Sequence, residues 1–237
     1  MAGLKLQNVR KAVSNTNNQA IDIMTKWENV CKNTMCPEED FDYIPLTEEN
    51  IVSGLNVKDN GKYKKVALNY DYFIDKRDDL ILVLERMNEL YNLNKRTFLI
   101  VGDPKNPLGV ISHSDLNSLP FLHAMWDIFY NFEIKLANSL KDRYDDKYIE
   151  NNFGYNERAA YEKDKKNSQE LEPIFYITLY KKIMFYNNLK GTNKINVKAK
   201  FRNNMAHPKS KAKVISNKTE ITELYETIVG IDEFLSL

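Results

Sequence analysis

The spacing of apolar and polar residues divides this chain into two parts that meet near Pro120. Before that point, short strand-like runs alternate with helical ones, and after it nearly the whole chain has helical spacing. In the first part, the aromatic and β-branched runs 41–46 and 51–57 flank a polar turn, which predicts a β-hairpin. Residues 1–32 are expected to be mostly helical.

The remainder of the first part predicts the order strand, helix, strand, turn, strand. Its helix has apolar residues three and four apart behind Asp78 and Asp79, whose carboxylates suit the positive end of a helix dipole. The predicted strands are 65–73, 97–101 and 108–112, and the predicted helix is 78–92.

The second part predicts four helices, which favours an antiparallel bundle. They are the helix that begins after Pro120 and the segments 175–186, 195–206 and 218–235. In the first of them the apolar stripe is interrupted at Glu133, where an apolar residue belongs. Because a buried charge is costly unless it is paired, Glu133 should have a partner inside the bundle or a cleft. The alternative is that Glu133 reaches solvent at the edge of the stripe.

Composition is that of a globular protein, with 237 residues of which 43% are hydrophobic and 28% charged. This length allows one large domain or two small ones. No apolar run is long enough for a membrane span, and the first residues lack the apolar stretch of a secretory signal. Cys31 and Cys36 are expected to be reduced, so we expect a cytoplasmic protein with no membrane partner.

The net charge of +1 hides an uneven distribution. Residues 173–219 hold 11 of the 34 basic residues and none of the 33 acidic ones, so the rest of the chain carries a net charge of −10. An acidic body with one basic segment favours a protein that binds a polyanion at one place. A solvated lysine-rich face is the alternative.

The sequence G-V-I-S-H-S-D-L, residues 109–116, follows the second strand–turn–strand pattern and resembles the end of a CBS motif. CBS motifs occur in pairs, and the earlier hairpin resembles the first partner. The resemblance implies an adenosine nucleotide as effector, with its phosphate at Ser112, its ribose at Asp115 and Gly109 in the same motif. The first motif departs from the pattern at Val57 and Asn60, so one nucleotide per chain is expected. Alternatively, Ser112 and Asp115 only cap the following helix.

The sequence K-F-R-N-N-M-A-H-P, residues 200–208, resembles the Arg-x4-His signature of the HEPN family, with a polar residue after the arginine. The matching residues are Arg202, Asn203 and His207, within a resemblance that covers roughly residues 119–237. It implies a metal-independent ribonuclease that is a homodimer with two facing signatures. The alternative is that Arg202 and His207 only brace a helix end, where cations are favourable without catalysis.

These residue types suit RNA cleavage in which the 2′-hydroxyl attacks the neighbouring phosphate. DNA lacks this hydroxyl and is not a substrate. Histidine can donate or accept a proton near neutral pH, and arginine offers a charged fork of donors to phosphate. Glu133 joins the candidate catalytic residues as the charged group in the stripe. Lys198, Lys200 and Lys209 are candidate RNA-backbone contacts. No cofactor or metal is expected for catalysis, because the segment around the signature has no carboxylates for Mg²⁺.

The sequence therefore predicts an α+β protein: a tandem CBS-like module, 1–118, followed by an all-α HEPN-like bundle of four or five helices, 119–237. The predicted function is that of a dimeric endoribonuclease whose activity is regulated by an adenosine nucleotide, in a role like that of a stress or anti-phage toxin. The alternative is a non-catalytic nucleotide-sensing dimer that binds RNA or a protein partner.

Overall fold

The computed structural model describes residues 6–13, 18–27, 43–48, 51–59, 62–191, 194–206 and 213–237. They form a mixed α+β protein with a helical C-terminal region. The chain divides into two compact units. The sheet unit comprises residues 16–124 and 211–225, and the helical unit comprises residues 1–15, 125–210 and 226–237. The division expected from the sequence, 1–118 and 119–237, uses one continuous stretch for each domain and stays a prediction.

The predicted hairpin is confirmed and belongs to a three-stranded antiparallel sheet. Its strands are β2 (Tyr43–Glu48), β3 (Ile51–Asp59) and β4 (Lys62–Ala67), in that order. The strand expected over residues 65–73 is wrong in its middle. Strand β4 ends at Ala67, and a 3₁₀ turn, η1 (Tyr70–Tyr72), precedes the next strand. The Asn69 amide donates to the Asp71 carboxylate at 2.6 Å, and such local side-chain bonds compete with a strand ladder.

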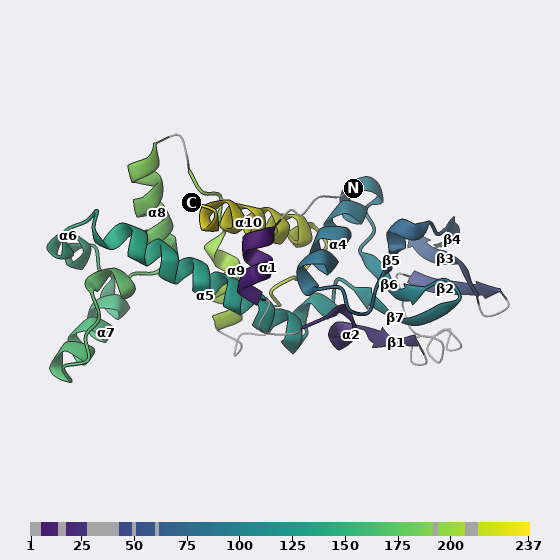
Figure 1. The fold of residues 1–237 in the computed structure, drawn as a ribbon, viewed down its shortest axis with the longest axis horizontal. Helices are drawn as coiled ribbons and strands as arrows, with labels where there is room; N and C mark the ends of the chain where they lie inside the picture. Colours follow the sequence, from purple (N-terminus) through teal and green to yellow (C-terminus); the bar gives the residue numbers. More distant parts are fainter. Residues whose placement is uncertain are drawn as a thin grey trace. The chain divides into compact units, whose positions relative to one another are not determined.

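A second sheet holds the core of the sheet unit, with strand order β1-β7-β6-β5 (Figure 1). Its central strand β6 (Phe98–Asp103) is parallel to β5 (Phe73–Ile74) and antiparallel to β7 (Asn106–Ser112). The helix α4 (Leu80–Asn94) links β5 to β6, contacts β6 and begins where the Asp79 carboxylate accepts from the Leu82 N–H at 2.8 Å. The predicted order of strand, helix, strand, turn, strand is confirmed.

The short edge strand β1 (Thr25–Lys26) explains why residue 109 is a glycine. A Cβ atom on Gly109 would lie 2.5 Å from the Thr25 carbonyl oxygen and 2.8 Å from Met24 Sδ. Gly109 therefore allows β1 to pair with β7. Before this strand lies α2 (Ala20–Ile23), so the mostly helical start expected for residues 1–32 is interrupted by a strand.

The helical unit contains more helices than its apolar spacing predicts. The expected helices are present as α5 (Leu119–Lys141), α8 (Leu179–Lys190), α9 (Ala199–Ala206) and α10 (Thr219–Leu235). The other elements are α1 (Gln7–Val13), α6 (Asp146–Asn151), α7 (Tyr155–Lys166) and the 3₁₀ turns η2 (Asp115–Asn117, in the sheet unit) and η3 (Pro173–Phe175).

Aromatic rings and a polar contact between distant helices hold the helical unit together. The Phe234 ring on α10 makes edge contacts with Phe132 on α5 and Tyr186 on α8, with ring centroids 5.2 Å apart in both pairs. At the start of the chain, the Val9 N–H donates to Asp232 Oδ1 at 2.9 Å, which fixes α1 on α10. This packing places residues of α5, α8 and α9 around one polar cluster.

Candidate functional site

Helix α9 carries Arg202 and is fixed at its start by neighbouring helices. The Asn187 side chain on α8 makes two hydrogen bonds to the backbone of Ile195, at 2.9 and 3.2 Å. On α10, Gly230 leaves room for the backbone of Asn196, because a Cβ there would lie 2.8 Å from the Asn196 carbonyl oxygen. Phe201 is fully buried beside Arg202. The position of the arginine is therefore set by the core.

Glu133 on α5 has the partners that its place in the apolar stripe predicts. Its Oε1 accepts a hydrogen bond from Lys182 Nζ at 2.8 Å, and its Oε2 accepts from Arg202 Nε at 3.2 Å. Arg202 Nη2 also lies 3.2 Å from Oε2. The exposed fractions of the side chains are 14% for Glu133, 2% for Lys182 and 30% for Arg202. The paired carboxylate is confirmed, and the cluster opens to solvent on the Arg202 side.

Trp126 holds the other face of the arginine. The guanidinium carbon of Arg202 lies 5.4 Å from the centroid of the Trp126 ring. Trp126 precedes Glu133 by seven residues on α5, so the two lie on the same side of the helix. A cation over an aromatic face is attracted by the ring quadrupole. Arg202 is thus fixed on one edge by a carboxylate and on one face by an indole. Its Nη1 atom has no hydrogen-bond partner among the described residues.

The cluster has an excess of positive charge, with two cations around one carboxylate. Burial lowers the pKa of Lys182 below its ordinary value, and the neighbouring Arg202 acts in the same direction. Glu133 opposes both effects, because its charge and its hydrogen bond favour the protonated amine. An anion that approached Arg202 from solvent would meet this unbalanced charge.

Lys181, the residue before Lys182 on α8, pairs with a different carboxylate. Lys181 forms an ion pair with Glu157 on α7, whose carboxylate also accepts from the N–H groups of Gly154 at 2.5 Å and Thr178 at 2.8 Å. Burial raises the pKa of Glu157, but the hydrogen bond from Lys181 and the two backbone bonds outweigh it and lower the pKa overall. The Glu157 carboxylate, with these three partners, fixes α7 to the start of α8. Lys182 is paired with Glu133 instead.

The other residues expected at this site are less involved in the cluster. Asn203 is exposed on α9. The Lys198 backbone N–H donates to Thr227 Oγ1 at 3.4 Å, and the Lys200 ammonium lies 4.9 Å from the centroid of the Phe201 ring. His207 and Lys209 lie outside the described residues.

Sequence reasoning missed Lys182, although a signal was present. The lysine lies on the apolar stripe of α8, three residues after the buried Leu179 and three before the buried Phe185. This is the same kind of interruption that singled out Glu133 on α5. Two opposite charges that interrupt two apolar stripes are candidates for one ion pair.

In the sheet unit, Ser112 and Asp115 contact each other directly. Asp115 Oδ2 accepts from the Ser112 N–H at 2.7 Å and from the Ser112 hydroxyl at 2.8 Å. Burial raises the pKa of Asp115, and the two bonds from Ser112 act against that rise. The residue that precedes η2, Ser114, makes no side-chain capping hydrogen bond, so these contacts tie Asp115 back to the end of β7 and do not show the capping alternative. Gly109, the third residue expected at the nucleotide, packs against β1.

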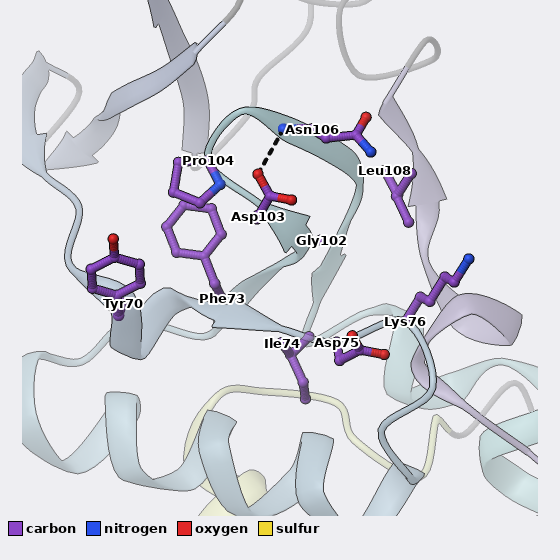
Figure 2. A pocket seen from close by; sticks show the side chains of 10 residues that line it. All are labelled: Tyr70, Phe73, Ile74, Asp75, Lys76, Gly102, Asp103, Pro104, Asn106 and Leu108. Carbon is purple, nitrogen blue, oxygen red and sulfur yellow. Dashed lines mark hydrogen bonds between the residues drawn. The ribbon is translucent and has the colours of Figure 1, made fainter.

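A cavity of about 450 Å³ lies at the other end of the β6–β7 hairpin (Figure 2). Figure 2 shows Phe73 and Pro104 on one side of it and Lys76 and Leu108 on the other. Ser112 pairs with Phe98 at the start of β6, whereas this cavity borders the turn after the end of β6. The structure therefore separates this cavity from the predicted nucleotide residues, none of which lines it.

Comparisons with family models, curated proteins and solved structures found no match for this chain. Among the described residues, no helix is both long enough and apolar enough to cross a membrane.

Proposed function

We propose that this protein is a metal-independent endoribonuclease of the HEPN type, with Arg202 and His207 as its catalytic residues. The observation that carries the proposal is the fixed guanidinium of Arg202, held by Glu133 and Trp126 five residues before His207. The acid-free segment 173–219 around it supplies a positive environment for a phosphate backbone.

In the proposed reaction, the RNA 2′-oxygen attacks the neighbouring phosphorus. The O2′–P bond forms, the P–O5′ bond breaks, and a 2′,3′-cyclic phosphate and a 5′-hydroxyl result. One proton leaves the 2′-hydroxyl and one reaches the departing 5′-oxygen. His207 carries one of these protons, because its imidazole can exchange a proton near neutral pH. Arg202 stabilises the charge that develops on the non-bridging phosphate oxygens.

Glu133 has a positioning role in this proposal. Its two oxygens are occupied by Lys182 and Arg202, so the carboxylate orients the arginine and leaves proton transfer to histidine. With Nε and Nη2 directed to Glu133, both N–H groups of Nη1 and the second N–H of Nη2 remain as donors for phosphate. A preorganised donor of this kind costs little reorganisation when charge develops.

The proposed active form is a homodimer, since one His207 cannot readily act as acid and base in the same step. A second histidine from a facing copy would supply the other proton transfer. Light scattering at the concentration of the activity assay should therefore give twice the mass of 27.7 kDa. A fully active monomer would contradict the composite site. The proposed effector is an adenosine nucleotide on the sheet unit.

The test is cleavage of single-stranded RNA by the purified chain in EDTA. We expect products with 2′,3′-cyclic phosphate or 3′-phosphate ends, and a loss of about 10²–10³ in rate for Arg202→Ala. His207→Ala should abolish cleavage. Lys163→Ala, which removes an exposed lysine on α7 outside the acid-free segment, is the matched control and should cleave normally. RNA that is bound but left intact would favour the regulatory dimer, and 3′-hydroxyl ends would indicate a different reaction.

A further inference from the structure

An exposed tyrosine on α5 lies on the same side of that helix as the two residues that contact Arg202. Tyr130 is four residues after Trp126 and three before Glu133, so these three side chains share one side of a helix with 3.6 residues per turn. Along the helix axis, Tyr130 is about 6 Å from Trp126 and about 4.5 Å from Glu133. Arg202 contacts both of those neighbours. The tyrosine therefore shares a helix side with both of the α5 residues that hold the guanidinium.

The exposure of Tyr130 distinguishes it from its neighbours. Its side chain is 56% exposed, whereas Glu133 is 14% exposed and Trp126 is half-buried. Tyr130 makes no hydrogen bond or ring contact with another described residue. Its ring is therefore open to solvent on a helix side that also carries the partners of Arg202, whose own side chain is 30% exposed.

We propose that Tyr130 is the stacking platform for an unpaired RNA base next to the phosphate that Arg202 holds. This inference rests on the proposed ribonuclease function and names the residue that binds a base of the single-stranded RNA substrate. Every nucleobase has a π-face, so an exposed aromatic ring beside a fixed cation binds a flexible strand with little preference for sequence. A base in a duplex is already stacked on its neighbours and is not available to the ring.

A base stacked on Tyr130 would help to orient the nucleotide for attack by its 2′-oxygen. In-line attack requires the nucleotide 5′ of the scissile phosphate to leave regular helical stacking, so that its 2′-oxygen lies opposite the leaving 5′-oxygen. A base held on Tyr130 fixes that nucleotide while Arg202 fixes the phosphate. Two separate contacts to neighbouring groups of one strand restrict its orientation, which is worth a large factor in rate.

The binding experiment uses the full chain with His207→Ala, so that the RNA is not cut. Its probe is a 12-nucleotide single-stranded RNA that contains 2-aminopurine, whose emission falls when it stacks on an aromatic ring. Added to that background, Tyr130→Ala should weaken binding about tenfold and restore the emission, since stacking on one ring contributes about this much. Tyr130→Phe keeps the ring and should bind like the parent. Tyr155→Ala removes a tyrosine that is 90% exposed on α7 and is the matched control.

Salt dependence separates stacking from charge. Tyr130→Ala removes no cation, so its slope of log affinity against log salt concentration should equal that of the parent. Arg202→Ala removes a phosphate contact and should reduce that slope by about 1. A duplex of the same sequence should bind more weakly and should not respond to Tyr130→Ala.

Three outcomes overturn the inference. If Tyr130→Ala binds the probe as tightly as Tyr155→Ala does, the ring is not a platform, while the proposed nuclease survives. If duplex and single strand bind equally and respond equally to Tyr130→Ala, the substrate class is wrong. If the parent binds no RNA at all, the inference and the proposed function both fail.

Discussion

The ammonium of Lys182, which is 2% exposed, donates a hydrogen bond to Oε1 of Glu133 at 2.8 Å. The second oxygen of the same carboxylate accepts from Arg202. One acid on α5 therefore links a buried cation on α8 to a half-exposed cation on α9. The charges of these three residues decide both the stability of the cluster and the direction of the arginine.

The cost of removing each charge should depend on what remains. Glu133→Gln leaves two neighbouring cations without a counter-charge and should lower the free energy of unfolding by about 3 kcal/mol. Lys182→Met leaves a neutral Glu133–Arg202 pair and an apolar side chain of similar length, so its cost should be about 1 kcal/mol or less. Urea unfolding followed by circular dichroism measures both.

The double variant, Lys182→Met with Glu133→Gln, tests whether the two side chains interact energetically. In Lys182→Met, the further change Glu133→Gln should cost clearly less than it does alone, because only one cation loses its partner. Additive costs would mean that Lys182 and Glu133 do not interact in solution. Lys190→Met, on the exposed part of α8, controls for the loss of a lysine as such.

Stability should also depend on pH through Lys182. Burial, with Arg202 beside it, lowers the pKa of Lys182 below its ordinary value of 10.5 in the folded chain. Between the lowered pKa and 10.5, the unfolded chain binds more protons than the folded one, so the free energy of unfolding rises with pH in this window. Below the lowered pKa the amine is charged in both states and the slope vanishes.

The comparison that checks this is urea unfolding of the parent and of Lys182→Met between about pH 7 and about pH 10. The difference between their free energies of unfolding should change in favour of the parent as the pH rises. Parallel curves would show that the folded state leaves the pKa of Lys182 unchanged.

The arginine at position 202 should not be replaceable by lysine. An ammonium group could not offer a planar fork to Glu133 while lying flat on Trp126, so Arg202→Lys would lose the orientation along with the second donor. We expect its single-turnover rate on RNA in EDTA to be within about tenfold of that of Arg202→Ala. A rate near that of the parent would mean that a point charge suffices.

Asp115→Ala removes the acceptor for the Ser112 N–H and hydroxyl. The loss of both bonds at a half-buried turn should lower the free energy of unfolding by about 1–2 kcal/mol, with or without nucleotide. Calorimetry with ATP, ADP and AMP on the same variant tests the proposed effector. A nucleotide held by this carboxylate should lose roughly ten- to a hundredfold in affinity. No heat of binding to the parent would contradict the effector proposal.

Gly109→Ala should weaken the pairing of β1 with β7. The added methyl group would lie 2.5 Å from the Thr25 carbonyl oxygen, so the edge strand must move. We expect a loss of about 2–3 kcal/mol in the free energy of unfolding. Hydrogen exchange should locate the change at residues 25, 26 and 109–111. Unchanged protection there would contradict the close approach of β1.

Local patterns were enough to predict several elements of this protein. The hairpin of β2 and β3, the helix α4 between two strands, and the long helix α5 all follow from apolar spacing and from turn or cap residues within the element. The sequence missed α6 and α7, because these helices bury few apolar side chains. In α7 the buried residues are Glu157 and Tyr161, and the acid is held by a cap and by Lys181.

The apolar pattern also predicts that Glu133 needs a partner, because a carboxylate in an apolar stripe cannot remain buried alone. The sequence alone locates the basic segment and the spacing of Arg202 from His207. Which cations Glu133 contacts depends instead on how distant helices pack. Lys182 and Arg202 lie 49 and 69 residues away from it, and they reach it because α5, α8 and α9 pack together. Periodicity shows which face of a helix is buried, whereas the opposing side chain depends on the packing of helices from distant parts of the chain.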